Sequence, residues 1–142
     1  MPAALTLIIP ALPNMKLSTN GKARLKPLQR ARITKEENER WYFLILFQLR
    51  RAMARGLADE MPLDILPYKK AELSWELMFP TKRHRDEDNL RGALKVVQDV
   101  LCVAQPQDKA LKDPPFRLGL IVNDSPDCLV DGGLVTSVGF PM

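Results

Sequence analysis

Residues 71–104 carry two different hydrophobic periods in succession, and this change of period limits the folds open to the chain. Apolar and polar residues alternate over residues 71–79, which is typical of a strand with one buried face. Over residues 90–104 the apolar positions recur at helical spacing, and Asp88 and Asn89 before them are good N-cap residues. The sequence therefore predicts a strand followed by a helix, as in α/β proteins.

The predicted helix has a core face and a charged face. Its apolar residues cluster on one side, while Asp88, Lys95 and Asp99 fall near a common line on the other. At about 1.5 Å of rise per residue, Lys95 stands about 10 Å and Asp99 about 16 Å from Asp88 along the axis. The two aspartates are too far apart to share one ion, whereas Lys95 can lean back toward the N-terminal end.

Two carboxylates separated by one residue stand where the strand passes into the helix, a place where α/β sheets tend to form their sites. Asp86 and Asp88 offer hard oxygen ligands that suit Mg²⁺ or Mn²⁺. A divalent ion held there would activate water and stabilise charge on a phosphate. The alternative is that acids at a helix start complement the macrodipole and cap its free amides. Spacing alone leaves both interpretations open.

A longer series of motifs includes this pair of acids. Residues 85–90 read Arg-Asp-Glu-Asp-Asn-Leu, residues 95–101 read Lys-Val-Val-Gln-Asp-Val-Leu, and residues 121–125 read Ile-Val-Asn-Asp-Ser. The series resembles the RusA family of Holliday junction resolvases. Members of that family carry an Asp-x-Asp-Asn-Leu motif, then a lysine and an aspartate four residues apart on the next helix, and then an acidic pair.

The resemblance implies a Mg²⁺-dependent, structure-selective endodeoxyribonuclease that resolves four-way DNA junctions by phosphodiester hydrolysis and acts as a homodimer. Carried over residue by residue, it implies that Asp86, Asp88 and Asp124 are catalytic carboxylates that bind the metal. It also implies that Lys95 is the catalytic lysine.

Two positions depart from the family pattern. In some members the lysine stands four residues after the second motif aspartate, where this chain has Gly92, and Asn123 stands where an acid is frequent. Positions four and seven residues after an aspartate share a helix face, so Lys95 keeps the geometry. The departures favour a second hypothesis, a catalytically inactive module that binds branched DNA. A third is an unrelated α/β protein in which the acids only cap a helix.

Positive charge is concentrated at the start of the chain. The first acidic residue is Glu36, and seven lysines and arginines precede it, although the net charge of the whole chain is only +4. Such asymmetry indicates a partner with phosphates, or else a solvated basic loop. His84 is the only histidine, so one chain cannot build a histidine-based site. The expected contacts to DNA backbone are Lys16, Lys22, Arg24, Lys26, Arg30, Arg32, Lys82, Arg83 and Arg85.

The 142 residues predict a single α/β domain with a small mixed sheet, in the order strand, helix, strand, helix, strands. We expect a first strand at 4–9, a basic loop at 14–33, and a helix at 34–55 that starts with a capping box. The apolar run 41–47 predicts burial of that helix on more than one side, in the core or in a dimer interface. Farther on, we expect a loop insertion at 105–115 and strands at 116–122, 128–130 and 134–140, the last two joined by a turn at Asp131-Gly132-Gly133.

Several classes of protein are disfavoured. No stretch approaches the ~20 apolar residues of a membrane span, and the first residues lack the positive region of a signal peptide. Cys102 and Cys128 form no Cys-x-x-Cys pair, which argues against zinc and favours a reducing, cytoplasmic setting.

Overall fold

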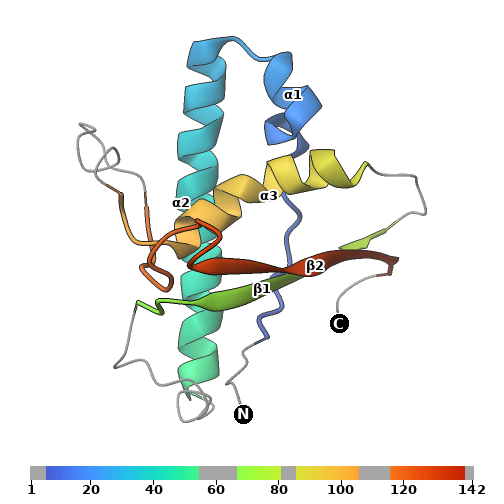
Figure 1. Cartoon of the computed structure of the whole chain (residues 1–142). Helices are drawn as coiled ribbons and strands as arrows, with labels where there is room; N and C mark the ends of the chain where they lie inside the picture. The colour runs from blue at the N-terminus through green and yellow to red at the C-terminus, as the bar shows by residue number, and fades with distance from the viewer. Residues whose placement is uncertain (1–5, 55–66, 81–85, 106–115, 140–142) are drawn as a thin grey trace.

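The computed structural model describes residues 6–54, 67–80, 86–105 and 116–139. A short 3₁₀-helix η1 (Met15–Leu17) and helix α1 (Thr19–Ala23) precede the long helix α2 (Pro27–Ala54). Strand β1 (Ala71–Phe79), helix α3 (Glu87–Leu101) and strand β2 (Leu129–Val138) follow. Helix α3 crosses α2, and the two strands lie side by side next to α3 (Figure 1). The chain is a single α/β domain, as predicted.

The two strands are parallel and are connected through α3. Their register runs from Ala71 opposite Leu129 to Phe79 opposite Val138. The predicted strand at 71–79 is confirmed to the residue, and its side chains alternate between more exposed and more buried positions. The sheet formed by the described residues is purely parallel, so the expectation of a mixed sheet is wrong for this part of the chain.

The predicted turn at Asp131-Gly132-Gly133 is instead a bulge inside β2. The register shifts here, because Leu73 pairs with Asp131 while Trp75 pairs with Leu134. One residue of β1 therefore faces two glycines. Gly133 has φ +109°, and a Cβ on Gly132 would stand 2.2 Å from Ser74 Oγ. The glycines allow a close approach within one strand, so the two short strands predicted around them are a single strand.

The predicted basic loop at 14–33 is largely helical. Asn14 Oδ1 accepts a hydrogen bond from Lys16 N at 3.0 Å and begins η1, and Ser18 Oγ accepts one from Gly21 N at 3.0 Å and begins α1. Helix α2 then begins at Pro27, since proline is well suited to the first turn of a helix. The predicted capping box at 34–37 is therefore wrong, because the helix is already two turns long there.

Two other predicted strands are not formed. The described part of the first, residues 6–9, is irregular, although Leu7 and Ile9 pack against the core. In the segment 116–122 only Ile121 makes bridges, to Tyr68 and Cys102. Backbone amides of this segment bond to carbonyls at the end of α3, which uses the groups that a strand would need. Most of the predicted insertion, residues 106–115, lies outside the described residues.

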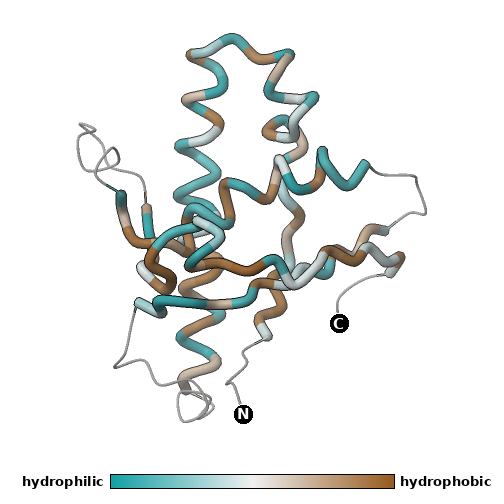
Figure 2. The backbone as a smooth tube through the Cα atoms, viewed as in Figure 1, coloured by the Kyte–Doolittle hydropathy of each residue, from teal (hydrophilic) through white to brown (hydrophobic). Residues whose placement is uncertain are grey.

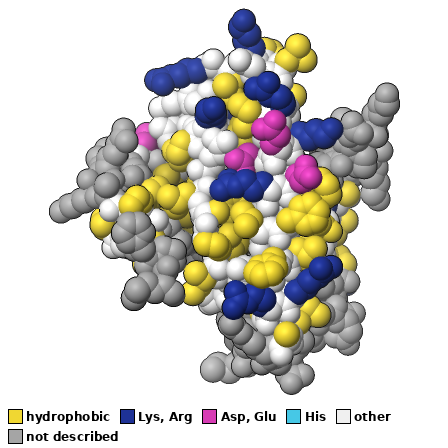
Figure 3. All heavy atoms as spheres, turned by 180° about the vertical axis from the view of Figure 1, so that it is seen from behind, with side chains coloured by type: hydrophobic (Ala, Val, Ile, Leu, Met, Phe, Trp, Pro, Cys, Tyr) yellow, Lys and Arg dark blue, Asp and Glu magenta, His cyan; other side chains and the backbone are white. Residues whose placement is uncertain are grey.

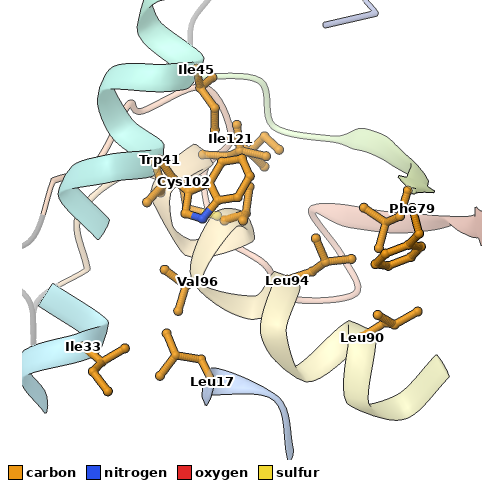
Figure 4. Packing of buried hydrophobic residues seen from close by; sticks show 14 residues of the cluster. Leu17, Ile33, Trp41, Ile45, Phe79, Leu90, Leu94, Val96, Cys102 and Ile121 are labelled. Carbon is orange, nitrogen blue, oxygen red and sulfur yellow. The ribbon is translucent and has the colours of Figure 1, made fainter. Parts of the chain in front are cut away.

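The core forms around α3, which lies between α2 and the strands. Trp41 and Ile45 reach it from α2 and Phe79 from β1, while Leu17 closes it at the η1 end (Figure 4). The apolar residues of α2 lie mainly in its second half, after a hydrophilic start (Figure 2). Helix α3 contributes the buried residues Leu90, Ala93, Leu94, Val96, Val97, Val100 and Leu101.

Within one chain the apolar run of α2 is buried on one side only, so the part predicted for a dimer interface stays a prediction. Trp41 and Ile45 are only 5% and 2% exposed, but Phe43 and Phe47 are 54% and 59% exposed. A single helix can turn only one side to α3, so the phenylalanines on the other side remain at the surface.

Candidate functional site

The start of α3 is capped by Asp86. Its Oδ1 accepts a hydrogen bond from the amide of Asp88 at 2.9 Å, and helical geometry begins at Glu87. The helix thus begins earlier than predicted, and the N-cap is Asp86 rather than Asp88 or Asn89. Asp86 and Asp88 are both exposed, at the positive end of the helix dipole. The capping interpretation therefore holds for Asp86.

Two turns farther along α3, Lys95 is held between two carboxylates. Its Nζ forms an ion pair with Asp124 Oδ2 and lies 3.2 Å from Asp99 Oδ1. The side chains of Lys95, Asp99 and Asp124 are 46%, 37% and 35% exposed, so solutes can reach the group. Asp99 extends the predicted charged face of α3. Asp124 comes to it from a segment 29 residues away in the sequence.

Asp124 is presented by a turn that Asn123 stabilises. Asn123 Oδ1 accepts a hydrogen bond from Ser125 N at 2.8 Å, which is an Asx-turn around Asp124. Gln105 Nε2 donates to the carbonyl of Val122 at 3.1 Å and to that of Val103 at 2.8 Å, and so ties the segment to the end of α3. The asparagine that departs from the family pattern thus has a local structural role.

A polar pocket of about 250 Å³ opens beside Lys95. Arg117 lies on its wall, and its Nη1 donates to Asn38 Oδ1 of α2 at 3.0 Å. The wall combines two cations with two carboxylates, so it can contact the phosphate oxygens of a ligand as well as a cation. The lining residues are Lys95, Asp99, Cys102, Val103, Gln105, Arg117, Asn123 and Asp124.

Burial raises the pKa of the Cys102 thiol above its ordinary value of 9.0, and the nearby carboxylate of Asp99 raises it further. Cys102 is 5% exposed, and its Sγ lies 3.4 Å from the carbonyl of Gln98. Both described cysteines, Cys102 and Cys128, are free. Cys102 is therefore a buried, protonated thiol at neutral pH, unlike a reactive cysteine.

The three predicted metal ligands do not form one group among the described residues. Asp86 and Asp88 are adjacent at the start of α3, while Asp124 pairs with Lys95 farther along the helix. Within the described ranges, no three His, Cys, Asp or Glu side chains are placed to hold one metal ion. As a donor set, three carboxylates suit Mg²⁺ chemically. The metal site remains a prediction.

Helix α1 packs on the first turn of α3, a contact that the sequence analysis missed. Asn20 N donates to Asn89 Oδ1 at 3.0 Å, and Thr19 Oγ1 lies 3.4 Å from the carbonyl of Asp88. Gly92 makes this approach possible, because a Cβ there would lie 2.7 Å from Thr19 Oγ1. The signal in the sequence was a glycine inside a strongly periodic helix, which indicates close packing.

Six of the residues predicted to contact DNA precede Glu36, and they surround the connection between α1 and α2. All but the partly buried Lys22 are exposed, and Arg30 Nη2 donates to the carbonyl of Lys22 at 2.9 Å. Lys16, Arg24 and Arg32 border a hollow of about 430 Å³ with an apolar wall. Because α1 contacts the first turn of α3, this basic surface adjoins the helix start that carries Asp86 and Asp88. His84 and the predicted contacts Lys82, Arg83 and Arg85 lie outside the described residues.

Arg91 fixes the start of α3 to the bulge in β2. Its guanidinium bonds to Glu87 at 3.0 Å and to Asp131 at 2.7 Å, and the hydrogen bond with Glu87 is the main reason that its pKa is raised. One cation thus joins the first turn of α3 to the sheet. Glu87, which stands between Asp86 and Asp88 in the sequence, is held in this ion pair with Arg91.

In comparisons with known proteins, the chain matches no family model, and no curated protein or solved structure is significantly similar to it. The resemblance to the RusA family therefore rests on the motif residues alone. Among the described residues, no helix has both the length and the apolar character of a membrane span.

Proposed function

We propose that this chain is a Mg²⁺-dependent, structure-selective endodeoxyribonuclease that resolves Holliday junctions by hydrolysing phosphodiester bonds. The observation that carries the proposal is the ion pair between Lys95 Nζ and Asp124 Oδ2. The motif resemblance selects these two residues without any knowledge of the fold. Their side chains nevertheless meet, and they do so beside a polar pocket.

Lys95 is suited to act on a phosphate. Its Nζ is about half exposed and is oriented by Asp99 and Asp124, so that a phosphate oxygen can approach it. A cation held in this way stabilises the negative charge that develops during hydrolysis. Asp86, Asp88 and Asp124 would hold Mg²⁺, which when bound activates water and neutralises charge on the scissile phosphate.

The basic surface of α1 and the first turns of α2 would position the DNA. Exposed lysines and arginines neutralise backbone phosphates without reading the base sequence, as a structure-selective enzyme requires. The contact of α1 with Asp88 and Asn89 brings this surface to the helix start that carries the acidic pair. A homodimer in the cytoplasm would present two such sites to symmetric strands of a junction.

A second candidate function is a catalytically inactive module that binds branched DNA. Its support is that the described residues contain no group of three metal-binding side chains and that Asp86 acts as a helix cap. The two functions differ in their use of metal. A binding module holds the junction equally well with Mg²⁺ or with EDTA and never cuts it.

The deciding experiment compares a labelled four-way junction with a matched linear duplex, each in Mg²⁺ or in EDTA. The nuclease proposal predicts paired, Mg²⁺-dependent incisions in the junction. Asp88→Asn, Asp124→Asn and Lys95→Gln should each slow cleavage by about 100-fold or more. Asp127→Asn, an exposed aspartate three residues after Asp124, is the matched control and should cleave normally. Junction binding without incision in Mg²⁺ and in Mn²⁺ would reject the enzyme and leave the binding module.

A further inference from the structure

One side of α2 points away from α3 and carries two exposed aromatic rings. Phe43 and Phe47, one turn apart, are 54% and 59% exposed. Phe43 is also held in position, since its ring packs edge-on against Tyr42 at 5.2 Å and lies 5.5 Å from Phe116. Large apolar side chains that adjoin each other on a surface are a sign of an interaction site.

Charged residues flank the two rings in a definite order. Glu39 stands one turn before Phe43, and Arg50 and Arg51 stand about one turn after Phe47. At about 100° per residue, all three project within about 80° of Phe43 around the helix. Seen from behind, acidic and basic side chains are mixed above a group of hydrophobic side chains, and basic side chains lie below it (Figure 3).

Two contacts determine where the charges of Arg40 and Arg51 lie. Arg40 would bring positive charge to the acidic end, but its Nη1 bonds to Glu37 at 2.9 and 3.2 Å and its Cζ lies over the ring of Trp41 at 5.2 Å. Glu37 and Trp41 are both buried, so Arg40 is drawn toward the core side of α2. Arg51 instead lies over Phe47, with Cζ 5.8 Å from the ring centre, and keeps its charge beside the exposed rings.

We propose that this stripe of α2, formed by Glu39, Phe43, Phe47, Arg50 and Arg51, is the interface with a second copy of the chain, packed antiparallel about a twofold axis near Ile45. Such an axis places Phe43 of each copy against Phe47 of the other. It also places Glu39 of each copy against Arg51 of the other. A parallel pair would instead bring like charges together, so the order acid, ring, ring, base is self-complementary only in the antiparallel arrangement.

The proposal concerns a different surface from the predicted DNA site and holds whether or not the chain cleaves DNA. A stripe on one helix makes a small interface, and small interfaces belong to weak, transient complexes. We therefore expect an equilibrium between monomer and dimer that depends on protein concentration. Sedimentation velocity over a wide range of concentrations of the full chain measures it.

Variants of the stripe test the interface. Phe43→Glu and Phe47→Glu should each raise the dissociation constant by about 30-fold or more, because each places a carboxylate against a ring at the centre of the interface. Val135→Glu is the matched control. Val135 is 61% exposed, but it lies on β2 in the sheet layer, so this variant should dimerise like the wild type. Circular dichroism checks that each variant is folded.

Exchange of charges tests the antiparallel orientation. Glu39→Arg and Arg51→Glu should each weaken the dimer, since each creates two like-charge contacts. The double variant that carries both changes restores opposite charges at both contacts and should dimerise more tightly than either single variant. If the double variant dimerises no more tightly than the single variants, the antiparallel arrangement is rejected. A wild type that stays monomeric at every concentration, a dimer that Phe47→Glu leaves intact, or one that Val135→Glu abolishes would overturn the interface.

Discussion

Gly92 of α3 lies directly against Thr19 of α1. A Cβ at position 92 would stand 2.7 Å from Thr19 Oγ1 and 2.8 Å from Thr19 N, and the second of these is backbone that cannot move without α1. The family position for a lysine is thus closed in this chain by the packing of α1. The lysine of the charged face stands one turn later, at Lys95.

Replacement of Gly92 by alanine should destabilise the fold. Alanine favours a helix interior over glycine by about 1 kcal/mol, but the clash with α1 costs about 1–3 kcal/mol. We expect the clash to dominate and the free energy of unfolding to fall, as measured by urea denaturation. Gly92→Lys should be more destabilising still. A more stable Gly92→Ala variant would show that α1 does not pack on α3 as described.

Two substitutions at Asp86 separate capping from metal binding. Asparagine is as good an N-cap as aspartate, so Asp86→Asn should unfold at nearly the wild-type denaturant concentration. Asp86→Ala removes the bond to the amide of Asp88 and should cost about 1 kcal/mol. The proposed nuclease should lose Mg²⁺-dependent cleavage in both variants. If Asp86→Asn cleaves junctions normally, Asp86 is a cap and not a ligand.

The basic hollow predicts a salt dependence of DNA binding. Arg24 and Arg32 border it, and each phosphate contact adds about 0.9 to the slope of log affinity against log salt for B-form DNA. Arg24→Gln and Arg32→Gln should each reduce that slope by about one, in titrations by fluorescence anisotropy. Lys70→Gln, an exposed lysine just before β1, is the control and should leave the slope unchanged. Equal slopes in all three variants would place the DNA elsewhere.

Cys102 predicts a loss of stability at alkaline pH. Burial raises the pKa of its thiol in the folded state, so the unfolded chain releases this proton at lower pH than the native one does. The contribution to stability is complete below the ordinary thiol value of 9.0 and is lost as the pH rises through the higher native pKa.

Urea denaturation at a series of pH values from about 7 to 10.5 measures this effect. In Cys102→Ala the free energy of unfolding should fall less over this range, because the titrating group is gone. Every other group is the same in both proteins, so its contribution cancels in the difference. Parallel curves for the wild type and the variant would contradict the prediction.

The elements that the sequence predicted well are those whose pattern is local. The alternation over 71–79 gives β1 to the residue, and the apolar spacing after Asn89 gives α3 and its core face. The long helix α2 was found, but its start was not, because Pro27 read as a loop residue rather than as the first residue of a helix. Gly132 and Gly133 were likewise interpreted from their residue type alone, as a turn. A glycine pair looks alike in a turn and in a bulge, and only the pairing with β1 distinguishes them.

The candidate site divides in the same way. The sequence by itself determined which residues lie on the charged face of α3, because helical periodicity places Asp88, Lys95 and Asp99 together without reference to the rest of the chain. Only the tertiary structure decided that Asp124 meets Lys95, that α1 lies on the first turn of α3, and that Phe43 and Phe47 stay at the surface. Contacts between distant segments depend on how the helices and strands pack, and neighbouring residues carry little information about that.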